Sequence, residues 1–334
     1  MRLIHTYLND VTGLIVIGLV IYFIYFNNLL GETVLMEVPD SFRQLNTIFL
    51  SILIEAIPFV LIGVVIAGFI QIFISEEQIR RCIPRNKVLA VVMSCIVGGI
   101  FPACECGIVP IVRRLIQKGV PIYAGIGFLL TGPLINPIVI MSTYMAFGND
   151  WNIAAMRMGI GFVAACIIAL LISFFYRSNQ LKQKLLSARS GHSHSIEKLT
   201  FSRKLSEMLK HAIDEFIDLG KYLIIGAFIA AFLQTYVSAE SLFIFGEGIV
   251  ASTMVMMGLA YLLSLCSEAD AFIGASFRNV FPTSSILAFL IYGPMIDLKN
   301  TIMLLSVFNA RFVLVLFFFI TIIVFISVHL TTII

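Results

Sequence analysis

The chain has 334 residues, of which 60% are apolar and 12% are charged, with a mean hydropathy of +1.02 and a formal net charge of +3. Soluble domains are typically about 45–50% apolar and about 25% charged, so these charges are too few to cover a water-exposed surface of this size. The composition excludes a soluble enzyme, a nucleic-acid-binding protein and a disordered chain. It predicts an all-α polytopic membrane protein, with the lipid bilayer as its surroundings.

Long apolar runs follow one another along the chain. They lie near residues 11–30, 47–74, 88–103, 122–147, 152–176, 216–237, 248–266, 283–297 and 301–329. A complete crossing needs about 20 residues. The first run has no small-residue cleavage site behind it, so we expect a retained helix rather than a signal peptide.

The predicted organisation has four parts. They are an N-terminal transmembrane helix with an outer loop (1–46), a first permease repeat (47–176), a basic cytoplasmic linker (177–215) and a second permease repeat (216–334).

The run at 88–103 is too irregular for a simple crossing, because glycines and a proline crowd its end and Cys104-Glu105-Cys106 follows. It belongs either to one straight span over 88–112 or to a hairpin that enters the membrane and returns. A straight span would put the eight Lys and Arg residues of the 177–215 linker outside. Positive charge is enriched in cytoplasmic loops, so the hairpin is favoured, with the N-terminus and the linker in the cytoplasm.

The hairpin topology also assigns the remaining basic residues. It leaves Arg43 and Arg278 outside and Arg157 and Arg311 within spans, and it puts every other Lys and Arg inside or at the inner boundary.

The second half of the chain repeats the first. Glu55 to Gly63 parallels Asp218 to Gly226 at an offset of 163, and Gly132 to Asn136 parallels Gly293 to Asp297 at an offset of 161. The interruption at Cys104-Glu105-Cys106 meets Cys266-Ser-Glu-Ala-Asp270 at an offset of 162.

Each half therefore predicts a helix, a re-entrant or broken hairpin, a helix broken near Gly-Pro and a long helix. Three crossings per half would bring the second half in from the opposite side, which gives two inverted-topology repeats plus one extra N-terminal helix. Interrupted segments at matching positions of two such halves indicate a midplane binding site in a secondary transporter.

The interrupted segments supply the candidate site. The predicted substrate-binding residues are Cys104, Glu105, Cys106, Cys266, Glu268, Asp270, Asn136 and Asp297. Glu55 and Glu268 are candidates for proton coupling, and Arg157 and Arg311 are candidates for pairing with the carboxylates. Ionisable groups at membrane depth are costly, which favours a functional role for them.

The thiols suggest the kind of substrate. Thiolates of Cys104, Cys106 and Cys266 would suit a soft, thiophilic metal or metalloid, whereas a structural alternative is that small cysteines pack where backbones approach closely. The leading hypothesis is an inner-membrane permease that exports a thiophilic metalloid.

Three alternatives stay open. The first is a zinc or other divalent-metal or organic-anion permease, in which the carboxylates matter and the thiols do not. The second is an intramembrane thiol redox protein, although none of the five histidines lies in a predicted hairpin to serve as a base. The third is a membrane scaffold for a partner subunit. We expect no cofactor and no ATP hydrolysis, because the chain has no phosphate-binding loop.

Four motifs also carry a family resemblance. They are Cys104-Glu-Cys-Gly-Ile-Val-Pro-Ile111, Thr131-Gly-Pro-Leu-Ile-Asn-Pro137, Cys266-Ser-Glu-Ala-Asp-Ala-Phe272 and Tyr292-Gly-Pro-Met-Ile-Asp-Leu-Lys299. Over about 47–330 the chain resembles the predicted permease family that includes the organoarsenical efflux permease.

This resemblance implies an inner-membrane efflux permease whose cysteines bind trivalent organoarsenicals. It also implies a partner, either a second membrane subunit or further copies of the chain. Many relatives have serine between the two cysteines, where this chain has Glu105 and so an additional carboxylate.

Overall fold

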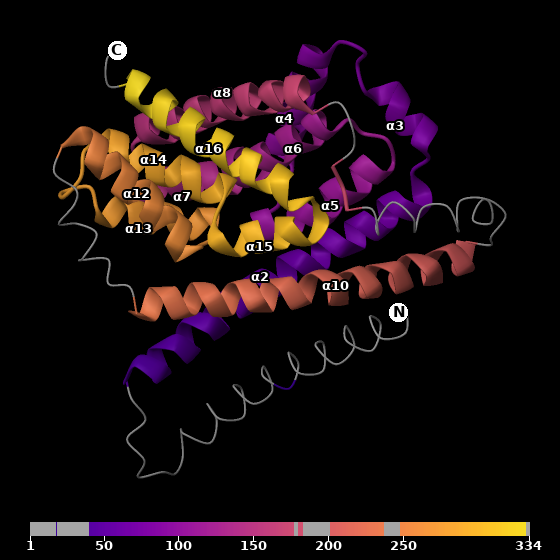
Figure 1. Cartoon of the computed structure of the whole chain (residues 1–334), viewed down its shortest axis with the longest axis horizontal. Coiled ribbons are helices and arrows are strands. Elements are labelled where there is room, and N and C mark those ends of the chain that lie inside the picture. The colour runs from indigo at the N-terminus through magenta and orange to yellow at the C-terminus, as the bar shows by residue number, and fades with distance from the viewer. Residues whose placement is uncertain (1–17, 19–39, 177–179, 183–200, 237–247, 332–334) are drawn as a thin grey trace, which may run out of the picture.

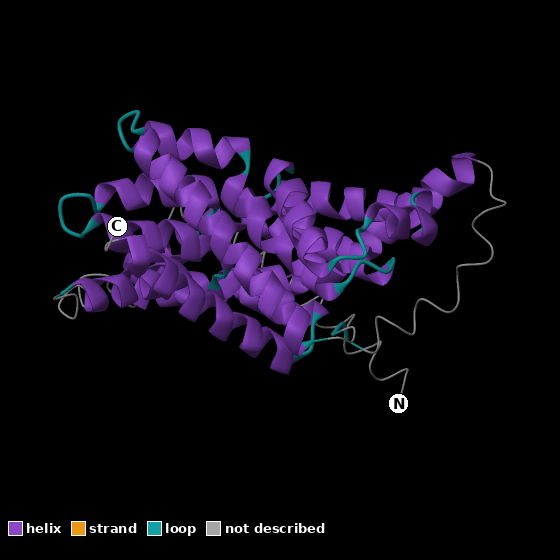
Figure 2. Cartoon of the chain, turned by 90° about the horizontal axis from the view of Figure 1, so that it is seen from above, coloured by secondary structure: helices purple, strands orange, loops and turns teal. Residues whose placement is uncertain are grey.

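The computed structural model describes residues 18, 40–176, 180–182, 201–236 and 248–331. Within these residues all named elements are helices, which pack into one elongated bundle (Figure 1, Figure 2). The all-α prediction is confirmed for this part of the chain. The expected helix near 11–30 lies outside it, apart from Gly18.

The helices follow the same order in the two halves. The first half contains α2 (Asp40–Phe73), α3 (Glu76–Cys82), α4 (Lys87–Ile100), α5 (Glu105–Gln117), α6 (Ile122–Ile135), α7 (Pro137–Ala146) and α8 (Trp151–Phe175). The second half contains α10 (Phe201–Tyr236), α12 (Ile249–Leu263), α13 (Ser267–Ser276), α14 (Thr283–Met295), α15 (Leu298–Val307) and α16 (Ala310–Thr331). Only α3 lacks a counterpart among these elements.

Six described stretches are long and apolar enough to cross a membrane, three in each half. They are Asp40–Phe73, Ile122–Ala146, Trp151–Phe175, Ser202–Tyr236, Thr283–Val307 and Ala310–Leu330. The prediction of a multi-pass membrane protein is confirmed. Two of the spans are helix pairs, α6 with α7 and α14 with α15, each broken by a residue that caps the second helix.

The segment around Cys104 turns back on itself. Cys95 of α4 lies against Gly127 of α6, and Gly98, one turn later in α4, lies against Thr131, one turn later in α6. The two helices are therefore parallel. The following helix, α5, is antiparallel to α6, because Ile116 lies against Gly125 near the start of α6 and Ile108 lies against Gly132 near its end. Because α4 and α5 run in opposite directions and each is shorter than a membrane crossing, the segment is the expected hairpin rather than a straight span.

The second half contains the same construction. α12 is parallel to α14, with Ser252 beside Ser285 and Ala260 beside Gly293, and α13 is antiparallel to α14. The two hairpins also contact the opposite halves, since α13 packs against α7 and α5 packs against α15.

Two long helices, α2 and α10, lie side by side along one edge of the bundle and run in opposite directions (Figure 1). α10 is longer than the apolar run near 216–237, because its first turns also pack: Met208 and Ala212 lie against Gly68 of α2. Gly63 of α2 lies so close to the Gly107 backbone of α5 that a side chain at either position would collide.

The expected single run at 301–329 is wrong, because the chain is not helical between α15 and α16. Residues 180–182 pair with 307–309 in a short antiparallel bridge, in which Lys182 N donates to Val307 O (3.1 Å) and Asn309 N donates to Gln180 O (3.1 Å). These bonds use backbone groups that a continuous helix would need, and so the helix breaks there. Arg311 consequently lies in the first turn of α16, and it is exposed.

Candidate functional site

Both hairpins turn at a cysteine. Cys104 is the residue that precedes α5, and Cys266 precedes α13 and accepts a hydrogen bond from Ala269 N at 3.5 Å. The first amides of a helix carry partial positive charge and unpaired N–H groups. The two hairpin tips therefore present helix amino ends together with thiols.

The two tips meet. Ser267, the first residue of α13, donates its hydroxyl proton to Glu105 Oε2 at 3.4 Å, and Glu105 is the first residue of α5. Both side chains are buried. These residues are 162 positions apart, which is the offset that relates the two interrupted motifs. Equivalent positions of the two hairpins are thus in direct contact.

Lys299 lies between the tips, although the distribution of Lys and Arg residues predicted that it would lie at the inner boundary of the membrane. Its ammonium group is 3.4 Å from Glu105 Oε1, 3.6 Å from Asp297 Oδ2 and 3.1 Å from the Ser264 carbonyl oxygen, to which it donates. Only 4% of the residue is exposed. Lys299 was not among the predicted site residues, although a lysine that follows a broken apolar segment is the kind of intramembrane charge that indicates a site.

A small space lies beside this ion-pair cluster. It measures about 10 Å³, roughly the room that one water molecule needs. It is lined by Ile52, Glu55, Ala56, Phe59, Cys104, Glu105, Cys106, Cys266 and Lys299. Five of the predicted site residues, drawn from α2 and both hairpins, therefore converge there.

The sulfur atoms of this space have close polar partners. The thiols of Cys104 and Cys106 interact with each other, and the thiol of Cys266 interacts with the Glu55 carboxyl group. Among the described residues, no group of three or more His, Cys, Asp or Glu side chains is arranged to hold a metal ion. In this arrangement the thiols share one space without forming a ready coordination shell.

A second buried cluster surrounds Arg157, of which 1% is exposed. Its guanidinium donates to Thr143 Oγ1 (2.6 Å) and to the Ser267 carbonyl oxygen (3.1 Å), and it interacts electrostatically with Asp270 and Glu268. Ser267 joins the two clusters, because its hydroxyl contacts Glu105 and its carbonyl contacts Arg157.

Asp270 is the exceptional member of this cluster. The residue is 1% exposed, yet neither carboxyl oxygen has a hydrogen-bond partner. A buried carboxyl group without partners is costly, and such groups call for an explanation beyond packing.

The other predicted residues have different surroundings. Asn136 is buried and accepts a hydrogen bond from Val139 N (2.8 Å), so it caps α7. Asp297 caps α15 through Asn300 N in the same way, besides facing Lys299. Glu268 is half-buried. Arg311 is exposed in the first turn of α16, whereas Arg157 is buried further along α8, so the two arginines do not occupy equivalent positions in their helices.

Two further contacts were not foreseen. The thiols of Cys95 and Cys166 interact with each other between α4 and α8. At the far end of α5, Glu215 of α10 bonds Arg114 at 2.7 Å and lies 3.4 Å from Arg113, and its side chain is 1% exposed. Neither contact has a local sequence signal, because the partners lie on separate helices.

These features define a multi-pass membrane protein with a polar site buried between two hairpins. The chain belongs to the predicted permease family, whose family model matches residues 41–333.

Similar proteins agree with this membership. UPF0718 protein YcgR of Bacillus subtilis (strain 168) is 53% identical over 289 residues, covering 86% of this chain and 97% of the relative. A protein of Streptococcus mutans described as "Putative two-component membrane permease complex subunit" is 42% identical over 278 residues, covering 83% of this chain and 91% of the relative. UPF0718 protein MJ0584 of Methanocaldococcus jannaschii is 25% identical over 144 residues, covering 42% of this chain and 39% of the relative. No solved structure matches the chain.

Proposed function

We propose that this permease is a secondary transporter of the inner, or plasma, membrane, which exports a thiophilic metalloid or organoarsenical through the site between the hairpin tips. The observation that carries the proposal is the convergence of Cys104, Cys106 and Cys266 on one buried space beside Lys299. Soft thiol ligands favour thiophilic species. The space has room for about one water molecule, so substrate binding requires the tips to separate.

The transporter contains two repeats of inverted topology. The first repeat, 47–176, follows the N-terminal segment 1–46, and the second, 216–334, follows the cytoplasmic linker 177–215. Two observations support the inversion. Corresponding long helices run in opposite directions, α2 against α10 and α8 against α16 (Figure 1). Equivalent tip residues, Glu105 and Ser267, touch each other, as expected near a pseudo-two-fold axis.

Protons are the coupling ions in this proposal. Glu55 interacts with the Cys266 thiol and lines the same space, so it is the carboxyl group placed to receive the thiol proton when sulfur binds the substrate. Glu268 lies within electrostatic range of Arg157 and serves as a second proton carrier. Arg157 balances the negative charge of Asp270 and Glu268, which agrees with the cost of leaving such groups unpaired in the membrane.

Lys299 gives a reason to keep one alternative. An ammonium group beside the thiols repels a divalent metal cation and attracts an anion, so the second candidate is an organic-anion permease. The Streptococcus mutans relative is described as a subunit of a membrane permease complex, which supports a partner membrane subunit for either function. An intramembrane thiol redox protein gains less support, because no histidine lines the described space.

Transport into inside-out vesicles tests the proposal. The panel contains a trivalent organoarsenical, arsenite, antimonite, zinc and cadmium, with uptake counted by elemental mass spectrometry. We expect uptake of one thiophilic species that Cys104→Ser/Cys106→Ser abolishes. Cys166→Ser is the matched control, because this thiol lies outside the space. If the double variant transports as well as the parent protein, the thiols are not ligands.

A further inference from the structure

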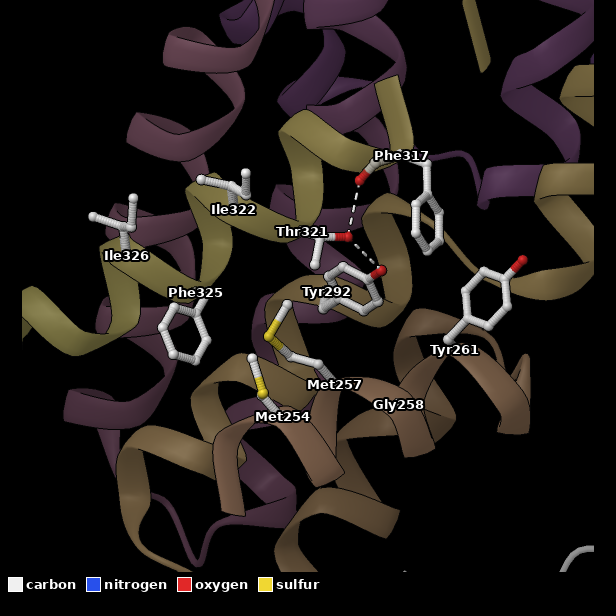
Figure 3. Close-up of a pocket in the computed structure, with 10 residues that line it drawn as sticks. All are labelled: Met254, Met257, Gly258, Tyr261, Tyr292, Phe317, Thr321, Ile322, Phe325 and Ile326. Carbon is white, nitrogen blue, oxygen red and sulfur yellow. Dashed lines mark hydrogen bonds between the residues drawn. The ribbon is translucent and has the colours of Figure 1, made fainter. Parts of the chain in front are cut away.

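A second and larger cavity lies in the second half of the bundle, between α12, α14 and α16 (Figure 3). Its volume is about 460 Å³, within the range of small-ligand sites. Aromatic rings and methionine side chains form most of its wall, including Met254, Met257, Tyr261, Tyr292 and Phe325.

The polar groups of the wall are already engaged. Tyr292 OH lies 2.9 Å from Thr321 Oγ1, which in turn donates to the Phe317 carbonyl oxygen at 2.9 Å (Figure 3). Tyr261 OH points toward Thr301 at 3.5 Å. An occupant that needed hydrogen bonds would therefore find no free partner among these hydroxyl groups.

The matching place in the first half is filled. There α4 packs directly against α8, and Cys95 and Ala169 share one buried apolar cluster. Met257 precedes Cys266 by the same number of residues as Cys95 precedes Cys104, but Met257 faces the cavity. The cavity is thus a feature in which the two halves differ.

The cavity opens at membrane depth. The side chains at its rim are exposed on the outer surface of the bundle, with 62% of Met254, 37% of Ile322 and 48% of Ile326 accessible. α16 is one of the six candidate spans and α12 is a shorter apolar helix, so we expect these residues to face hydrocarbon in a bilayer. Gly258 widens the space, because a side-chain carbon added there would meet nothing within 4 Å.

We propose that this cavity binds an acyl chain of a membrane lipid, which enters from the bilayer between α12 and α16. An apolar cavity does not hold water, and acyl chains are the apolar molecules present at its opening. Inside the membrane the gain comes from van der Waals contact, which aromatic and thioether side chains supply. This proposal does not depend on the transported substrate.

The acyl chain would occupy the space that α8 closes against α4 in the first half. Tyr261 is on α12, the helix that precedes Cys266, and its hydroxyl group donates to Thr301. The Thr301 hydroxyl group in turn donates to the Asp297 carbonyl oxygen. The lipid would therefore hold α12 away from α16 next to the charged cluster.

Photo-crosslinking of the full chain in phospholipid vesicles tests this proposal. The vesicles contain a phosphatidylglycerol with a diazirine in one acyl chain, and mass spectrometry locates the adducts after irradiation. We expect adducts concentrated on the cavity wall, at Met254, Met257 and Phe325, and their loss in Gly258→Leu, whose side chain would fill the space. Gly159→Leu is the matched control, because Gly159 is also an exposed helical glycine with open space around it, and it should keep the adducts.

Other outcomes would overturn the proposal. Adducts spread evenly over outward-facing residues, or unchanged in Gly258→Leu, would indicate ordinary surface lipid. Displacement of the adducts by a compound from the transport panel would make the cavity a substrate site instead. If Gly258→Leu does not fold, Met254→Trp at the rim provides the second variant, with the same expected loss.

Discussion

At the level of single residues, the buried charges around Lys299 depend on one another. The ammonium group lies within 4 Å of both Glu105 and Asp297, and all three residues are nearly inaccessible. Replacing a whole buried pair by apolar groups is often tolerated, whereas removing one partner leaves an uncompensated charge. Lys299 is the residue whose positive charge compensates the two buried carboxyl groups.

The substitution Lys299→Met should lower the free energy of unfolding in detergent by about 3–5 kcal/mol and should abolish transport. The reason is that two carboxyl groups would stay buried without a cation. Adding Glu105→Gln to this variant should restore part of the stability, and a double-mutant cycle measures the coupling. Lys299→Arg serves as the charge-preserving control. A Lys299→Met protein as stable as the parent would show that the carboxyl groups do not need this cation.

At the level of helices, the first hairpin is held at both of its ends. Its tip contacts the second hairpin through Ser267, and its return arm, α5, is joined to α10 by Glu215 and two arginines. The backbones of α5 and α2 also approach closely at Gly107 and Gly63, as small residues allow in membrane helices. The first hairpin is therefore attached both to the second hairpin and to the two long helices.

The substitution Glu215→Gln should reduce the free energy of unfolding by about 2–3 kcal/mol, the range for a hydrogen bond to a charged group. Arg113 and Arg114 would keep their positions but lose the negative partner. Chemical unfolding in detergent measures the change. Asp214→Asn, at an exposed neighbouring residue, should change stability by no more than about 0.5 kcal/mol. Equal effects of the two substitutions would argue against a structural role for the buried pair.

At the level of the whole molecule, the two halves share an order of helices and differ in detail. The tips meet between halves, and α13 with α7 and α5 with α15 are reciprocal contacts. The differences are equally specific, because Lys299 stands where the first half has an exposed isoleucine, Ile138, and the apolar cavity belongs to the second half. A symmetric framework thus carries an asymmetric site.

The proposed inverted topology makes a direct prediction for the loops of the two hairpins. A cysteine at Arg85, in the turn before α4, should react with a membrane-impermeant maleimide from the cytoplasmic side. A cysteine at Val280, in the turn after α13, should react from the outer side. Both positions are exposed, and the six natural cysteines are first replaced by serine. Labelling of both positions from the same side would rule out inversion.

Much of the architecture was predictable from local sequence. Apolar length defines the spans, and the interruption at Cys104-Glu105-Cys106 together with the charge bias correctly indicated a hairpin. The break at Phe308 was not predictable, because its cause is pairing with residues 180–182, which are remote in sequence. Asn136 was predicted as a substrate-binding residue because it follows the Gly-Pro break, and the role that the structure shows for it is capping of α7.

The sequence by itself determined the class of protein, the three spans of each half, the two hairpins and the cysteines and acids at their tips. These features depend on composition and on the order of residues, which act within one or two helical turns. The tertiary structure alone decided which groups meet. Lys299 lies between Glu105 and Asp297, Ser267 lies between the two clusters, and a cavity opens between α12, α14 and α16. Such contacts join helices that are far apart in the chain, and they depend on packing that no local pattern encodes.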